Sequence, residues 1–298
     1  MRRLLNDLID YLKSFESLKS LVWKAWIAFN GLTRNHRDLP SFIIIGAQKA
    51  GTTSLFSYLS HHPELLPSIK KEIHFFDGAR YPWRDDDPNA ETWYRAQFPF
   101  QWSSKNRKKT FESSPFYLFN PATPGRIHSW MPEVKLIVLL RNPSERAVSH
   151  YFHESRKGRE TLEIQAAFEA EESRLAQAMA SDDFESFAFR KQSYKARGRY
   201  REQLERYFNL FAREQVLVLC SEDLFADPAK CLKEVYRFLE ISEDFEIEDL
   251  TPANVAGNRT DVDPETYRYL DDYFEPHNEA LFEFLGVRYP WSNNREET

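Results

Sequence analysis

Residues 42–59 read FIIIGAQKAGTTSLFSYL, in which two apolar runs enclose a turn bounded by Gly46 and Gly51. This order is typical of a strand, a phosphate-binding loop and a helix, because the turn directs backbone N–H groups and the start of the helix at an anion. In loops that bind nucleoside triphosphates, the lysine follows the second glycine. Here Thr52 has that position and the lysine, Lys49, lies inside the loop. The segment therefore predicts phosphate binding, but it does not match the loop of an enzyme that hydrolyses ATP.

A second apolar run, KLIVLL at residues 135–140, is the strongest candidate for a neighbouring buried strand. Enzymes that hydrolyse nucleoside triphosphates hold Mg²⁺ with an aspartate near such a strand. This run ends instead in Arg141, followed by Asn142 and Pro143. A cation repels a metal ion and attracts a second phosphate. The two strand ends thus predict two anion sites for one ligand, such as a nucleotide with phosphate at its 5′ and 3′ positions.

The two motifs together resemble those of the sulfotransferases that use 3′-phosphoadenosine 5′-phosphosulfate (PAPS). In that family the phosphate loop binds the 5′-phosphosulfate. A strand followed by Arg-x-Pro, with a serine eight positions after the arginine, binds the 3′-phosphate. This sequence has Arg141, Pro143 and Ser149 at the matching positions, in the family's order. The resemblance extends over residues 40–291.

Further segments resemble the branch of that family that contains the heparan sulfate and other glycan sulfotransferases. Residues 70–77, KKEIHFFD, match its Lys-Glu-x-His-Phe-Phe-Asp signature. Three positions depart from the branch: Ser113 replaces a frequent lysine, Gln203 replaces an occasional histidine, and residues 257–259 are GNR in place of Lys-Gly-Arg. These differences leave the nucleotide site intact and the identity of the acceptor open.

The resemblance implies roles for individual residues. Lys49 stabilises the charge that develops on the bridging phosphate oxygen, and Glu72 removes the proton of the acceptor hydroxyl. His74 is the alternative base or a structural neighbour, and Lys71 either helps to hold the sulfonate or is a solvated lysine. For Tyr200 and Arg259, a contact with the nucleotide and a structural role are both open. The predicted cofactor-binding residues are Gln48, Lys49, Ala50, Gly51, Thr52, Thr53, Ser54, Arg141, Ser149, Tyr200 and Arg259; no metal ligand is predicted.

Composition sets further limits. The 298 residues are 42% hydrophobic and 15% aromatic, which suffices for the core of one large α/β domain without metal or disulfide support. The formal net charge of −6 argues against a general nucleic-acid partner. Cys220 and Cys231 are the two cysteines, and we expect free thiols, as in a reducing compartment. These observations favour a cytoplasmic location, with peripheral attachment to a membrane left open.

Strands and helices alternate along the chain. This predicts an α/β, P-loop-type three-layer fold with a central parallel sheet flanked by helices. Because ligands of such sheets bind beyond the carboxyl ends of the strands, Gly46 and Arg141 both lie where a ligand is expected. The tryptophans Trp83, Trp93 and Trp102 of an irregular excursion either stack on sugar rings or pack that loop. The expected strands cover residues 41–45, 110–112, 136–140 and 216–219, and the expected helices cover residues 52–60, 92–96, 144–154, 162–179, 194–211, 229–239 and 265–284.

The chain is expected to have two parts. Residues 1–39 form an amphipathic helical arm and linker, because apolar residues recur at helical spacing with lysines and arginines between them. Residues 40–298 form a single domain. The arm either packs on that domain or on a second subunit, or it lies on a membrane surface.

The predicted reaction is transfer of the sulfuryl group of PAPS to a hydroxyl or amine of a carbohydrate-type acceptor, with release of 3′,5′-ADP and without a metal. Two alternatives stay open. The first is a phosphate-loop kinase or nucleotidase, which requires Mg²⁺ and an acid to hold it. The second is a non-catalytic nucleotide-binding relative whose N-terminal helix recruits partners.

Overall fold

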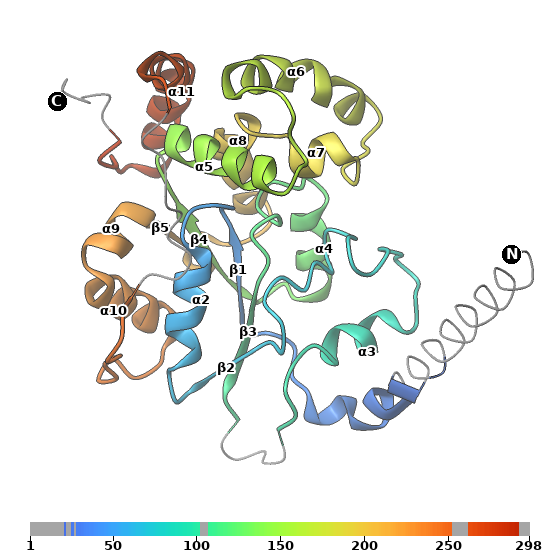
Figure 1. Cartoon of the computed structure of the whole chain (residues 1–298). Coiled ribbons are helices and arrows are strands. Elements are labelled where there is room, and N and C mark those ends of the chain that lie inside the picture. The colour runs from blue at the N-terminus through green and yellow to red at the C-terminus, as the bar shows by residue number, and fades with distance from the viewer. Residues whose placement is uncertain (1–20, 22–24, 27, 102–106, 252–261, 292–298) are drawn as a thin grey trace, which may run out of the picture.

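The computed structural model describes residues 21, 25–26, 28–101, 107–251 and 262–291. A parallel sheet forms its centre, with the strand order β2-β3-β1-β4-β5 (Figure 1). Phe42 on the central strand pairs with Phe111 on one side and with Lys135 on the other. The strands are β1 (Phe42–Gly46), β2 (Leu65–Pro67), β3 (Lys109–Ser113), β4 (Lys135–Leu140) and β5 (Val216–Cys220). This arrangement confirms the predicted α/β fold.

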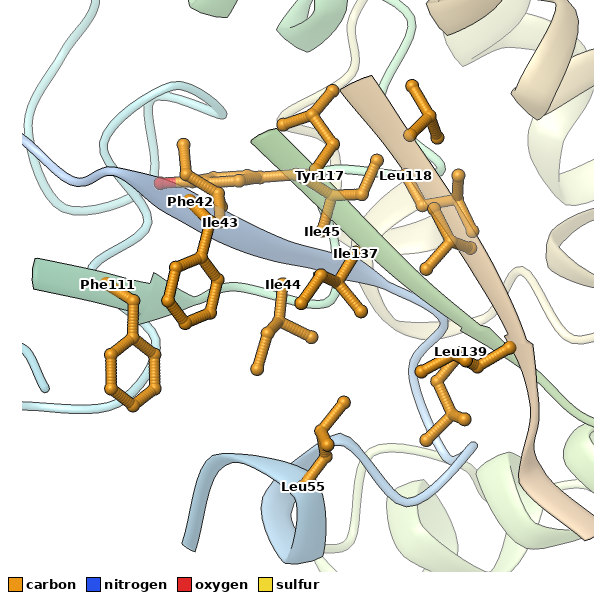
Figure 2. Packing of buried hydrophobic residues seen from close by; sticks show 14 of the residues in the cluster. Phe42, Ile43, Ile44, Ile45, Leu55, Phe111, Tyr117, Leu118, Ile137 and Leu139 are labelled. Carbon is orange, nitrogen blue, oxygen red and sulfur yellow. The ribbon is translucent and has the colours of Figure 1, made fainter. Parts of the chain in front are cut away.

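Every residue of β1 is buried, so both faces of the sheet are covered. Helix α2 (Thr52–Ser60) packs on one face, against β1, β2 and β3. Figure 2 shows Ile44 directed at Leu55 of this helix. On the other face, the segment after β3 crosses the central strand, and the Leu118 N–H donates to the Ile45 carbonyl at 2.8 Å. A Cβ atom on Gly46 would lie 2.5 Å from the Cβ atom of Leu118, so this crossing requires a glycine.

The remaining helices surround the sheet on three sides (Figure 1). Helices α9 and α10 pack against β5, and α4 lies on the opposite side of the molecule from α2. Helices α5, α6, α7, α8 and α11 gather at the carboxyl ends of the strands, where the loop after β1 also lies. Their bounds are α3 (Ala90–Arg95), α4 (Thr123–Trp130), α5 (Pro143–Arg156), α6 (Ile164–Ala180), α7 (Phe187–Lys191), α8 (Tyr200–Phe208), α9 (Ser221–Ala226), α10 (Pro228–Leu239) and α11 (Pro264–Leu285).

The four expected strands are present, and one expected helix is corrected. The helix predicted for residues 194–211 begins only at Tyr200, because a 3-10 turn, η2 (Ala196–Gly198), precedes it. This turn is packed so tightly that a Cβ atom on Gly198 would lie 2.6 Å from a ring carbon of Phe274. Cys220 and Cys231 are buried free thiols, as predicted.

Little of the predicted N-terminal arm lies within the described residues. Residues 28–33 are helical and lead into η1 (Arg34–His36). Trp26 packs against the main core, whereas Leu21 and Leu32 are exposed. The division into residues 1–39 and 40–298 stays a prediction. Among the helices that the structure describes, none is long and apolar enough to cross a membrane.

Candidate active site

The loop after β1 folds into a compact turn at the carboxyl edge of the sheet. Lys49 and Gly51 both have left-handed backbone angles, with φ of 71° and 92°. The Ala47 N–H donates to the Leu139 carbonyl at 2.8 Å and thereby fixes the loop to β4. Helix α2 begins directly after the loop and has no acidic residue in its first turn. The partial positive charge of this helix end is therefore available to an anion.

The hydroxyl residues that follow the loop differ in exposure. Thr52 is buried, Thr53 is half-buried and Ser54 is fully buried, with Tyr58 as a hydrogen-bond partner. Ala50 is also fully buried, and its carbonyl accepts a hydrogen bond from the Ser221 hydroxyl at 2.8 Å. Their predicted contacts with a nucleotide stay predictions.

Arg141 lies beside this loop. Its guanidinium Nη1 donates to the Lys49 carbonyl at 3.1 Å, and its Nη2 lies 3.3 Å from a carboxylate oxygen of Glu145. The Tyr200 hydroxyl donates to the Arg141 carbonyl at 2.9 Å. The structure therefore brings Arg141 and Tyr200 to the phosphate loop. Ser149 lies buried on α5, the helix that starts just after Arg141, and Arg259 lies outside the described residues.

The N-terminus of α5, next to Arg141, is capped by neighbouring residues of the sequence. The Asn142 side chain accepts hydrogen bonds from the N–H groups of Ser144 and Glu145, at 3.0 and 3.2 Å. Pro143 occupies the first helical position, where its missing N–H costs nothing. The cap thus fixes where β4 ends and α5 begins, and with it the position of Arg141.

The predicted catalytic residues form a second group. Lys71 Nζ lies 2.9 Å from Glu72 Oε1, and His74 Nε2 lies 3.5 Å from Glu72 Oε2. On its other side, His74 Nδ1 lies 2.6 Å from Asp77 Oδ2. The Glu72 N–H donates to the carbonyl of Ser113 at 2.9 Å. An imidazole therefore lies between two carboxylates, at the end of β3.

Lys71, Glu72, His74 and Asp77 lie close together, and their contacts shift the pKa values of Glu72, His74 and Asp77. Desolvation raises the pKa of Glu72, but the hydrogen bond with His74 and the charge of Lys71 outweigh it, so the pKa falls well below its ordinary range. Desolvation lowers the pKa of His74, but its hydrogen bonds with Asp77 and Glu72 outweigh it, so the pKa rises. The Glu72 side chain is 44% exposed and the His74 side chain 18%. Glu72 is thus the ionised group of this set that faces solvent most.

Both groups lie at the same edge of the sheet. Ser113, which holds the Glu72 N–H, ends β3 and pairs with Ile44 of β1. Gly46 ends β1 and opens the phosphate loop. The predicted catalytic residues follow β2 and lie against the end of β3, whereas the phosphate loop follows β1, the strand beside β3. Both therefore lie at the carboxyl edge of the sheet, where ligands of such sheets bind.

Sequence reasoning assigned no role to two residues of the site, Asp77, which ends the KKEIHFFD signature, and Arg197. Arg197 is 3% exposed, donates to Gln48 Oε1 of the phosphate loop, and lies 4.8 Å over the Phe116 ring. Burial, followed by the charge of Arg146, lowers its pKa to about 9. It lies far along the chain from Gln48, so no local pattern indicates the contact.

The tryptophans near the site pack the loop. Trp93 is buried and stacks on Phe75, with ring centroids 5.7 Å apart. Trp83 packs on the same phenylalanine and carries the Arg126 guanidinium 5.1 Å over its ring. Trp102 lies outside the described residues. Among the residues that the structure describes, no group of three or more His, Cys, Asp and Glu side chains could hold a metal ion; metal independence stays a prediction.

Comparison with known proteins decides the family. A family profile of the sulfotransferase domain matches residues 39–260. The chain belongs to the sulfotransferase domain family. The crystal structure of a sulfotransferase from Alicyclobacillus acidocaldarius superimposes on this fold with a TM-score of 0.68. The two sequences are 31% identical, and the match covers 85% of this chain and 98% of that chain. The predicted family resemblance and the fold are confirmed.

Curated relatives of this sulfotransferase domain are of two kinds, a membrane-associated sulfotransferase and bifunctional heparan sulfate enzymes. The chain is 27% identical to the membrane-associated sulfotransferase kil1 of Dictyostelium discoideum, over 86% of this chain and 67% of that protein. It is 26% identical to a bifunctional heparan sulfate N-deacetylase/N-sulfotransferase of Drosophila melanogaster, over 88% of this chain and 24% of the relative. A mouse protein of the same description is 28% identical, over 83% of this chain and 30% of the relative. The chain thus spans a third or less of these bifunctional proteins.

Proposed function

We propose that this sulfotransferase transfers the sulfuryl group of PAPS to a hydroxyl or amine of a carbohydrate-type acceptor and releases 3′,5′-ADP. Family membership supports sulfate transfer. The observation that supports the donor most directly is the hydrogen bond of 3.1 Å from the Arg141 guanidinium to the Lys49 carbonyl. It brings into contact two segments that are far apart in the sequence, and we assign both of them to phosphate binding.

The residues at the phosphate loop and at the end of β4 suit a ligand with two phosphate groups. The start of α2, Lys49 and Arg141 are all positive, and the first turn of the helix contains no acid. An arginine can donate two parallel hydrogen bonds to one phosphate, so we assign Arg141 with Ser149 to the 3′-phosphate. Gln48 to Ser54 are assigned to the 5′-phosphosulfate, and Tyr200 and Arg259 are assigned to the nucleotide. When bound, PAPS supplies the sulfuryl group, with a phosphate as the leaving group.

The chain's own residues then perform the proton and charge steps. As the acceptor oxygen bonds to sulfur, Glu72 accepts its proton, and the bond from sulfur to the bridging phosphate oxygen breaks with its electrons going to that oxygen. Lys49 stabilises the charge there, and Lys71, 2.9 Å from Glu72, helps to hold the sulfonate. His74 is less suited to be the base, because both of its ring nitrogens face carboxylates.

The acceptor and the location stay proposals. Two of the relatives above are named for heparan sulfate, which supports a carbohydrate. One relative is named as membrane-associated, which supports a peripheral contact of the N-terminal arm with a membrane in an otherwise cytoplasmic protein. A second copy of the chain is the other proposed partner of the arm.

Thermal unfolding with nucleotides tests the donor. We expect 3′,5′-ADP to raise the melting temperature without any divalent ion, and ADP and ATP to raise it far less, because at equal concentration the ligand with the higher affinity for the folded state stabilises it more. Transfer of label from PAPS to a panel of glycans then tests the acceptor. Tight binding of ATP that depends on Mg²⁺ would refute the proposal and favour a kinase or nucleotidase.

A further inference from the structure

A buried carboxyl group lies behind the catalytic residues. Glu112, on β3, is fully buried. Its Oε1 lies 2.7 Å from the Tyr94 hydroxyl and 3.3 Å from the Tyr117 hydroxyl, and its Oε2 lies 2.7 Å from the Ser114 hydroxyl. The reaction proposed above does not use this group or the three hydroxyls around it.

Two of these hydroxyls have a second set of partners. Ser114 Oγ accepts a hydrogen bond from the N–H of His74 at 3.2 Å. The Tyr117 hydroxyl accepts from the N–H groups of Phe75 and Phe76, at 2.9 and 3.3 Å. The network therefore binds three consecutive backbone N–H groups of the segment that follows the catalytic glutamate.

The direction of these hydrogen bonds depends on the carboxylate. An ionised carboxylate only accepts hydrogen bonds, whereas a hydroxyl has one proton to donate and lone pairs to accept. When Ser114 and Tyr117 donate to Glu112, their lone pairs are left for the backbone N–H groups. Burial raises the pKa of Glu112 to about 7, against the hydrogen bonds from Tyr94 and Ser114. The carboxylate form therefore prevails above neutral pH.

The segment needs such support because its backbone is strained. Glu72 and His74 have φ angles of 64° and 53°, in the left-handed region that residues other than glycine seldom adopt. Strained conformations of this kind persist only where the surrounding structure fixes them. The network supplies this fixation at His74 and the two residues after it, and Glu72 lies two positions before His74.

We propose that Glu112, Ser114 and Tyr117 are positioning residues that hold Glu72 and His74 in the geometry for proton transfer. The inference rests on the proposed function, since it assumes Glu72 to be the base. Loss of the network displaces the base and not the phosphate loop, because its contacts reach residues 74–76. The rate of transfer falls while the affinity for nucleotide is kept.

Ser114→Ala and Tyr117→Phe are the direct tests, with kcat, KM and the Kd for 3′,5′-ADP as readouts. We expect kcat to fall roughly tenfold or more, because small misplacements of a catalytic group are costly, and the Kd to stay within about twofold. Tyr236→Phe is the matched control, since Tyr236 is also a buried tyrosine but lies on α10, and its hydroxyl has no hydrogen-bond partner among the described residues. It keeps its kcat.

A double mutant separates positioning from general destabilisation. If Ser114 acts through Glu72, then Ser114→Ala has no further effect on the residual turnover of Glu72→Gln, measured with a radiolabelled donor. Two results would overturn this inference and leave the proposed function standing. One is a double mutant in which the two losses of kcat add, and the other is an unchanged kcat in the variants while the wild type is active. A wild-type chain that transfers no sulfate from PAPS to any acceptor overturns the proposed function, and this inference with it.

Discussion

Replacement of Glu112 by glutamine should change how the stability of the fold depends on pH. Burial raises the pKa of Glu112 to about 7, from the value of 4.5 for an exposed glutamate, with hydrogen bonds from Tyr94 and Ser114 opposing it and His74 and Asp77 nearby. The folded chain thus resists ionisation of this group more than the unfolded chain does. The stability that the protonated Glu112 contributes is fully present below its pKa in the unfolded chain. It is lost as the pH rises through its pKa in the folded chain.

The size of the loss follows from the two pKa values. A difference of about 2.5 pKa units corresponds to roughly 3 kcal/mol once both states are ionised. Most of this loss, roughly 2 to 3 kcal/mol, falls between about pH 5 and pH 8. Glutamine does not ionise, so the variant avoids this loss. Because glutamine also alters the hydrogen bonds with Ser114 and Tyr94, the readout is the change with pH and not the stability at one pH.

Urea denaturation of wild type and Glu112→Gln at several pH values measures the effect. The unfolding free energy of the variant, relative to wild type, should rise by roughly 2 to 3 kcal/mol from about pH 5 to pH 8. Glu91→Gln is the control, since Glu91 is a half-exposed glutamate that pairs with Arg95. The change in pH dependence should be larger for Glu112→Gln than for Glu91→Gln, because only Glu112 is fully buried. Parallel curves for Glu112→Gln, within about 0.5 kcal/mol, would refute the reasoning.

Three further predictions concern the proposed reaction. Arg141→Ala should weaken binding of 3′,5′-ADP roughly tenfold or more and leave binding of 5′-AMP nearly unchanged; equal losses in calorimetric titrations would contradict the assignment to the 3′-phosphate. Lys49→Ala should lower kcat about a hundredfold or more, and a kcat near that of wild type in a steady-state assay would exclude a role at the leaving oxygen. Asp77→Asn removes the buried carboxylate that holds His74; kcat should fall with an unchanged Kd for 3′,5′-ADP, and loss of nucleotide binding would instead indicate a wider structural defect.

The part of the fold that the sequence predicted is the part with strong local patterns. The run of residues 42–46 and the loop before α2 were recognised because apolar runs and glycines lie in direct succession. Strand β2 was missed because it has only three residues, Leu65–Pro67. The start of α8 differs from the prediction, because the helix-favouring Lys195, Ala196 and Arg197 are followed by Gly198, a poor helix former. Gly198 ends a 3-10 turn and packs closely against Phe274.

In the candidate site, too, the sequence predicted only those residues that belong to a local pattern. Lys49 and Arg141 were found because each follows a predicted strand, and Glu72 because it belongs to a recognisable signature. The contacts of Glu112 with Tyr94, and of Arg197 with Gln48, join residues that are distant in the chain and carry no periodic signal. Such contacts depend on the folded topology, which places strand ends side by side, and local sequence cannot indicate them.

The stretch of chain around η2 touches both halves of the site. Arg197 donates to Gln48 of the phosphate loop and to the carbonyl of Arg190, while the guanidinium of Arg190 lies 3.6 Å from Asp77, behind His74. A movement of this stretch that one bound substrate favours is therefore felt at the site of the other. By thermodynamic linkage such an influence is reciprocal, so each of the two proposed substrates is expected to change the affinity for the other by the same factor.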